Sequence, residues 1–100
     1  MREYSNQQEI EKCKKWIAEW ITPIKTINRK RSAYGLKHFT ELLYGYVSND
    51  SFIDAAIQLG YKYVATSEKE SDFYFNMSFV KTKNYYEKIN DMKKNGQLKV

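Results

Sequence analysis

The chain has 100 residues, a mass of 12.0 kDa and a formal net charge of +5. This length allows a single domain, residues 1–100, and excludes an enzyme with separate substrate and cofactor domains. The hydrophobic content of 42% is typical of a globular protein, and no apolar run approaches the ~20 residues that cross a membrane. Because Cys13 is the one cysteine and the segment after Met1 is polar, we expect a reduced cytoplasmic protein without a signal peptide.

A first helix is predicted to begin near Asn6. Ser5 and Gln8 match a capping box, in which a hydroxyl at the N-cap bonds to a backbone N–H one turn later. Apolar residues then recur every three or four positions and form one helix face: Ile10, Cys13, Trp16, Ile17, Trp20 and Ile21. Pro23 disfavours helical geometry at the preceding residue, so the helix should end there and residues 23–31 should form a basic connector.

Two more helices, joined by a short turn, are predicted between residues 32 and 60. Ser32 and Ser48 are good N-caps, and Gly45 and Gly60 are typical of helix C-termini. The expected apolar faces carry Leu36, Phe39, Leu42 and Leu43 in one helix, and Phe52, Ala55, Ala56 and Leu59 in the other, with Ile53 and Ile57 beside them. The turn of about four residues between them is typical of a helix-turn-helix junction.

After residue 60 the hydrophobic pattern changes to strict alternation. Residues 61–65 and 73–77 are aromatic-rich and are separated by a polar loop, which predicts a β-hairpin. Thr82 can then cap a last helix with Tyr85, Tyr86, Ile89 and Met92 on one face. This order of elements predicts an α+β winged helix-turn-helix fold, with a three-helix core, a two-stranded hairpin and a C-terminal helix.

The predicted third helix is poorly suited to reading duplex DNA. A recognition helix uses Arg, Lys, Asn or Gln to reach base edges in the major groove. Here it carries Asp50 and Asp54 without any Arg or Lys, and the loop of the predicted hairpin, the wing, carries Glu68 and Glu70. Since carboxylates repel phosphates, sequence-specific duplex binding is disfavoured, and these four side chains are instead candidates for docking a protein.

The positive charge is concentrated in two segments. Residues 23–47 carry five basic side chains against one acidic, and residues 81–100 carry six lysines against two acidic side chains. The first segment also precedes a helix N-terminus, which favours anions. Basic residues interleaved with aromatic rings suit single-stranded nucleic acid, although core packing is the commoner role of any one tyrosine. The candidate contacts are Lys25, Arg29, Lys30, Arg31, Tyr34, Lys37, Lys81, Lys83 and Lys88.

Patterns that carry catalysis are weak in this sequence. One histidine and one cysteine are too few for a metal cluster. Cys13 lies on an apolar helix face, where cysteine acts as a small hydrophobe, and we expect His38 to be a partly buried structural residue. The four glycines are scattered, so no phosphate-binding loop is predicted. We therefore expect no enzymatic activity, no metal and no cofactor.

Three stretches carry a resemblance to a known group of proteins: KTINRKRSAYGLKH at 25–38, YVSND at 46–50 and FIDAA at 52–56. They resemble small accessory proteins of phages and of mobile genomic islands of Gram-positive bacteria, above all those in the replication modules of staphylococcal cassette chromosomes. That group includes winged-helix proteins that bind single-stranded DNA and a small partner of a family A DNA polymerase. The resemblance implies a non-enzymatic replication accessory that contacts DNA, a polymerase, or both.

Two classes of function remain open. In the first, the chain binds preferably single-stranded DNA beside a replication enzyme, with a strong salt dependence from its phosphate contacts. In the second, the acidic third helix and the loop after it dock a larger protein, as an anti-CRISPR-type inhibitor would. The two are compatible, because a protein could occupy the acidic face while DNA follows the basic one.

Overall fold

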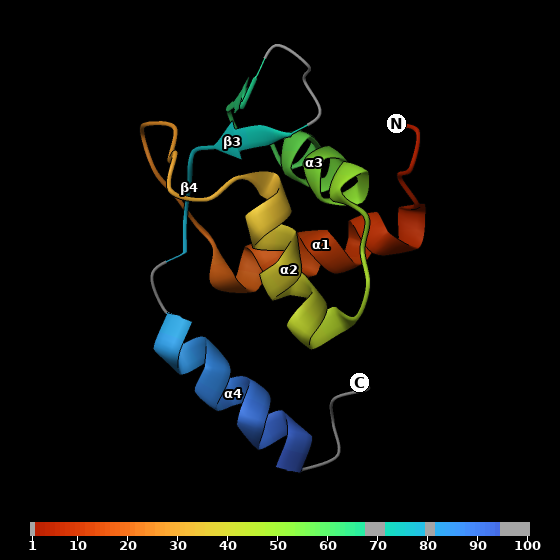
Figure 1. Ribbon diagram of the computed structural model, residues 1–100, viewed down its shortest axis with the longest axis vertical. Helices are drawn as coiled ribbons and strands as arrows, with labels where there is room; N and C mark the ends of the chain where they lie inside the picture. The colour runs from red at the N-terminus through yellow and green to blue at the C-terminus, as the bar shows by residue number, and fades with distance from the viewer. Residues whose placement is uncertain (1, 68–71, 80–81, 95–100) are drawn as a thin grey trace.

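The computed structural model describes residues 2–67, 72–79 and 82–94, which form four helices and four short strands. Helices α1, α2 and α3 pack together, β2 and β3 lie at one end of the molecule, and α4 lies at the other end (Figure 1). The elements in chain order are α1 (Gln7–Trp20), β1 (Thr22–Pro23), α2 (Ala33–Tyr44), α3 (Asn49–Gln58), β2 (Tyr63–Ala65), β3 (Phe73–Phe75), β4 (Met77–Ser78) and α4 (Thr82–Lys94). None of the described helices has the length and apolar character needed to cross a membrane.

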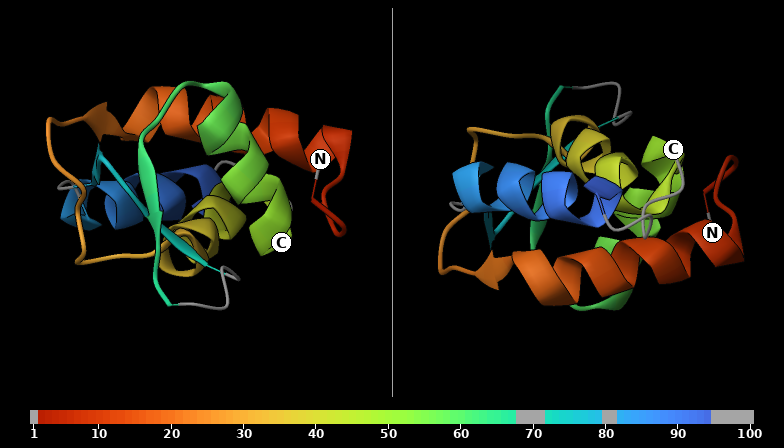
Figure 2. Two further views of the ribbon diagram at one scale, coloured as in Figure 1. Left: turned by 90° about the horizontal axis from the view of Figure 1, so that it is seen from above. Right: turned by 90° about the horizontal axis from the view of Figure 1, so that it is seen from below.

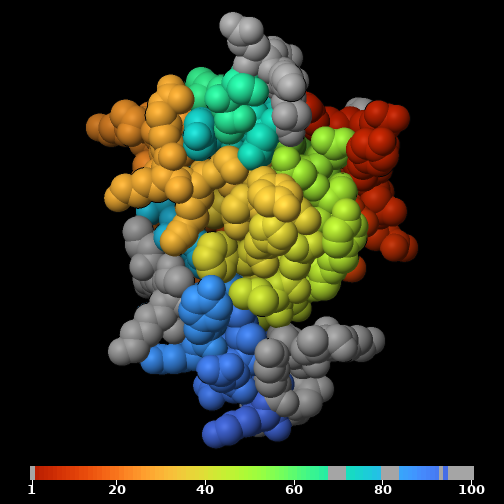
Figure 3. Space-filling view, viewed as in Figure 1, coloured from red at the N-terminus to blue at the C-terminus, as the bar shows by residue number. Residues whose placement is uncertain are grey.

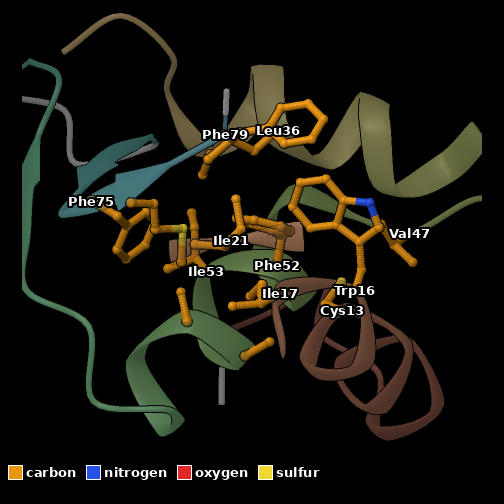
Figure 4. Close-up of a cluster of buried hydrophobic side chains, with 14 of the residues drawn as sticks. Cys13, Trp16, Ile17, Ile21, Leu36, Val47, Phe52, Ile53, Phe75 and Phe79 are labelled. Carbon is orange, nitrogen blue, oxygen red and sulfur yellow. The ribbon is translucent and has the colours of Figure 1, made fainter. Parts of the chain in front are cut away.

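The core forms around the apolar face of α1. Trp16 is fully buried, and its ring meets Phe52 and Phe79 edge-on at centroid distances of 6.0 and 5.3 Å (Figure 4). The predicted face is confirmed, with Trp20 packed at its margin. The predicted cap is wrong by one residue, because the Asn6 side chain accepts the first amides and the Ser5 hydroxyl is donated to an α3 carboxylate.

The ends of α2 and α3 agree with the prediction in position, although Ser32 precedes α2 without a side-chain capping hydrogen bond. The Ser48 hydroxyl accepts the Ser51 amide at 3.0 Å, and Gly45 and Gly60 adopt φ angles of +80° and +87° just beyond the two helices. In this left-handed region a side chain would be strained, so glycine is required at both sites.

The buried face of α2 is rotated from the predicted one. It runs through Ala33, Leu36, Lys37 and Thr40, whereas Leu42 is exposed. Burial of the two polar residues is possible because each has an internal partner: Lys37 pairs with Glu41, and Thr40 donates to the Leu36 carbonyl. At the end of α3 the predicted burial of Leu59 is likewise wrong, because that side chain is exposed.

The predicted hairpin is confirmed, and a second strand pair adjoins it. β2 and β3 are antiparallel, with Tyr63 opposite Phe75. One residue later the chain enters β4, which pairs with β1 so that Thr22 faces Ser78. The sequence placed residue 23 in an unpaired connector, because a two-residue strand contains no alternation that could reveal it.

The position of α4 is set by Tyr85. Its hydroxyl accepts the Trp16 indole N–H at 2.8 Å and donates to the Phe39 carbonyl, so one buried side chain joins α4 to α1 and α2. Ile89 is also buried, whereas the predicted partner Tyr86 is exposed. The described residues thus form a compact α+β domain of four helices with two small antiparallel sheets.

Candidate nucleic-acid interface

The basic connector, residues 24–31, is an ordered loop. The Asn28 amide donates to the Phe75 carbonyl at 2.9 Å, and its side-chain Nδ2 donates to the Met77 carbonyl at 2.9 Å. Its Oδ1 accepts the amide of Lys30 at 3.0 Å. These hydrogen bonds attach the loop to the ends of β3 and β4, so the backbone that carries its basic residues has a fixed position.

A groove of about 940 Å³ separates this loop from β4. Three basic side chains in succession, Arg29, Lys30 and Arg31, line it. Its remaining lining is apolar at Ile24, Ile27, Leu36, Met77 and Phe79, and polar at Thr26, Asn28 and Ser78. In the space-filling view the loop projects from the left edge of the molecule, beside α2 (Figure 3). The groove thus combines positive charge with an apolar surface.

The two arginines of the groove rest on aromatic rings. The Arg29 guanidinium lies 5.7 Å from the ring centroid of Tyr74. The Arg31 guanidinium lies 5.0 Å from the ring centroid of Phe39 and 5.7 Å from that of Phe79. Stacking on a ring limits the orientations of a guanidinium, and its N–H groups can still bind an anion edge-on.

The predicted anion preference of the α2 N-terminus is already satisfied within the chain. The Asp72 carboxylate accepts the Tyr34 amide at 3.2 Å, and it also accepts the Phe73 amide and the Asn49 side chain. An external phosphate would have to displace this carboxylate. The helix end is therefore less available to an external anion than the sequence predicted.

Lys37 does not belong to this interface, contrary to the prediction. Its side chain is 8% exposed, and its ammonium is 3.2 Å from the Glu41 carboxylate, with the rings of Tyr34 and Tyr46 on either side. A lysine engaged in this way contributes little to an external phosphate. Tyr34 itself is exposed, so its ring is accessible from solvent.

His38 is also placed differently from the prediction. Its side chain is 52% exposed, and Nδ1 lies 3.1 Å from the Glu41 carboxylate. Its ring meets the Tyr34 ring edge-on at 4.6 Å. It therefore lies on the outer face of α2 rather than partly inside the protein.

The second basic segment is described only in part. Lys88 is exposed and its ammonium lies 5.8 Å from the Trp20 ring, while Lys81 and the side chain of Lys83 lie outside the described residues. Lys25 is exposed within the loop. The loop and the first turn of α4 lie on the same side of the molecule in all three ribbon views (Figures 1 and 2).

The carboxylates of α3 bind the N-terminal segment. The Asp50 carboxylate is 3.1 Å from Arg2 Nε and accepts the Tyr4 amide at 3.0 Å. Asp54 is 9% exposed and accepts the Arg2 amide at 2.8 Å and the Ser5 hydroxyl. The expectation that Asp54 faces a protein partner is thus wrong, since its burial depends on these internal donors. The other two acidic candidates, Glu68 and Glu70, lie outside the described residues.

Cys13, the free cysteine, is packed in the hydrophobic core. Burial raises the pKa of Cys13 to about 12, which keeps the thiol protonated at neutral pH. No three His, Cys, Asp or Glu side chains gather into a metal-binding group in the part of the chain that the structure describes. Asn28 and Phe79 were not among the predicted site residues. For Asn28 the sequence offers one signal, an asparagine inside a connector, where such residues often fold the backbone.

No family model, no curated protein and no solved structure matches this chain. Its function is therefore inferred from its own residues.

Proposed function

We propose that the chain binds single-stranded nucleic acid, with DNA as its ligand, in the groove between the loop of residues 24–31 and β4. One observation carries this proposal: Arg29, Lys30 and Arg31 lie along a groove with a mixed apolar and polar lining, on a loop fastened by hydrogen bonds. Phosphates would bind the basic side chains, while unstacked bases would lie against the apolar lining.

We also propose that the fold is a winged helix. The order α1–β1–α2–α3–β2–β3–β4 and the pairing of β1 with the strand that follows the hairpin support this assignment. In a winged helix α3 would be the recognition helix, but its residues 51–56 are all buried here, and Asp50 binds Arg2. This burial favours a DNA contact outside α3.

The cellular role that we propose is a non-enzymatic replication accessory of a mobile genetic element, acting beside a DNA polymerase. The resemblance at residues 25–38 supports it, because that stretch contains the three basic residues of the groove. The competing role, docking of a larger protein through the acidic side chains of α3, has less support because Asp50 and Asp54 bind the N-terminal segment.

Exposed charges of the groove can be tested without disturbing the core. Arg29 and Lys30 are exposed, whereas Arg31 packs on Phe39, so the informative variant is Arg29→Gln with Lys30→Gln. We expect it to weaken binding of a short labelled oligodeoxynucleotide about tenfold at low salt. Its salt slope should also fall by about 1.4, at ~0.7 for each lost phosphate contact on a single strand.

The matched control removes two other exposed lysines, Lys15 and Lys62, by the same substitution. Both variants lower the net charge equally, so a difference between them assigns binding to the groove rather than to overall charge. Equal weakening by both variants would contradict the proposed groove, and no binding by the wild-type chain at low salt would contradict the function itself.

A further inference from the structure

We propose that a second hollow, between α2 and α4, holds an unstacked base of the same strand. This inference rests on the function proposed above and extends it. The hollow has a volume of about 350 Å³ and is lined by His38, Phe39, Glu41 and Leu42 from α2 and by Tyr86 from α4. Figure 3 shows this face, with α2 in the centre and α4 below it.

The rim of the hollow carries exposed rings and an exposed aliphatic side chain. Tyr86 is 46% exposed and its ring centroid is 6.2 Å from that of Phe39. Leu42 and His38 are exposed on the opposite side, along α2. A flat base inserted here would remove this apolar surface from water and stack on at least one ring, which is how single strands are held without sequence preference.

Arg31 connects the hollow to the groove. Its guanidinium lies over Phe39, which lines the hollow, and over Phe79, which lines the groove, at 5.0 and 5.7 Å. A phosphate bound at Arg31 would have the groove on one side and the hollow on the other. Adjacent nucleotides of one strand can therefore occupy both places.

The carboxylate at the edge of the hollow does not oppose an anionic strand. Glu41 is 3.2 Å from the Lys37 ammonium and also accepts the Val47 amide, and its other oxygen lies 3.1 Å from His38. Its charge is balanced by a buried cation at close range, so little repulsion reaches a phosphate. Lys37, which was predicted to bind nucleic acid directly, would instead act here by neutralising the charge of Glu41.

An abasic oligonucleotide distinguishes contacts to bases from contacts to phosphates. Wild-type protein should bind a labelled oligothymidylate more tightly than an abasic strand of the same length, because both carry the same phosphates. Tyr86→Leu should weaken the oligothymidylate about tenfold, leaving the abasic affinity and the salt slope unchanged. His38→Leu, on the other rim, provides a second variant that does not depend on the docking of α4.

Tyr4→Leu is the matched control, because Tyr4 is 72% exposed and makes its contacts with α3 through the backbone. The inference is overturned if the wild type binds both strands equally, or if both rim variants keep full affinity, as expected if the hollow receives a protein side chain. The second result leaves the proposed function standing, whereas the first would also remove the base contacts proposed for the groove and leave only its phosphate contacts. Failure of the wild type to bind either strand would instead contradict the proposed function.

Discussion

The side-chain Nδ2 of Asn76 donates to the carbonyl oxygen of Ile24 at 2.9 Å, and the Ile24 amide returns a hydrogen bond to the Asn76 carbonyl at 3.0 Å. The same side chain accepts the Lys62 amide at 2.7 Å through Oδ1. Asn76 lies between β3 and β4, so this one residue joins the start of the basic loop, the approach to β2 and the turn between the two sheets.

Replacing Asn76 with alanine should therefore loosen the basic loop. Two side-chain hydrogen bonds would be lost and their backbone partners left partly unpaired, at a cost of about 2 kcal/mol in the free energy of unfolding. Urea denaturation measures this loss, and anisotropy of a labelled oligonucleotide should show weaker binding with an unchanged salt slope. Asn90→Ala, at an exposed position of α4, is the control and should change neither quantity.

The Tyr85 hydroxyl should be important for stability. Tyr85→Phe leaves the Trp16 indole N–H and the Phe39 carbonyl without their partner inside the core, which should lower the free energy of unfolding by about 2 kcal/mol. Denaturation followed by tryptophan fluorescence reports this directly, since Trp16 contacts the altered ring. Tyr86→Phe serves as the control at the exposed neighbour, and an equal midpoint for both variants would exclude the buried hydrogen bonds as a source of stability.

Glu9 should make the protein sensitive to acid. Its burial alone would raise the carboxyl pKa, but hydrogen bonds from the Ser48 amide and the Ser51 hydroxyl, with the nearby charge of Lys12, leave the pKa below its ordinary value of 4.5. A carboxyl with a lowered pKa in the folded state stabilises the protein above its unfolded-state pKa. This contribution is lost as the pH falls through the folded-state value.

Glu9→Gln should accordingly lower stability at neutral pH and flatten its decline below pH 4.5. The free energy of unfolding, measured by urea titration at a series of acidic pH values, checks the slope. Glu11→Gln, at an exposed position two residues after Glu9 in α1, is the control. A wild-type slope in the Glu9 variant would show that other carboxyl groups dominate the acid response.

Much of the fold could be predicted from local patterns. The ends of α2 and α3 follow from Ser48, Gly45 and Gly60, because caps and left-handed glycines act within a few residues. The apolar face of α1 and the alternation in β2 and β3 could also be predicted from the sequence. Helices and strands repeat their buried positions every three to four residues or every two, so the pattern is local. The basic stretch at 29–31 was likewise recognised, and the structure brings it together in one groove.

Whether each charged side chain is buried with an internal partner or exposed to solvent was decided only by the tertiary structure. Lys37 and Asp54 add to the formal charges of their segments, yet the first is buried against Glu41 and the second against the amide of Arg2, 52 positions away. The pairing of β1 with β4 and the placement of Phe79 beside Arg31 also join distant segments. The sequence by itself therefore determined the helices, the β2–β3 hairpin and where cations are frequent, because those properties are local. Which cations face solvent depends on partners that only folding brings near, and the tertiary structure alone selected Arg29, Lys30 and Arg31 for the groove.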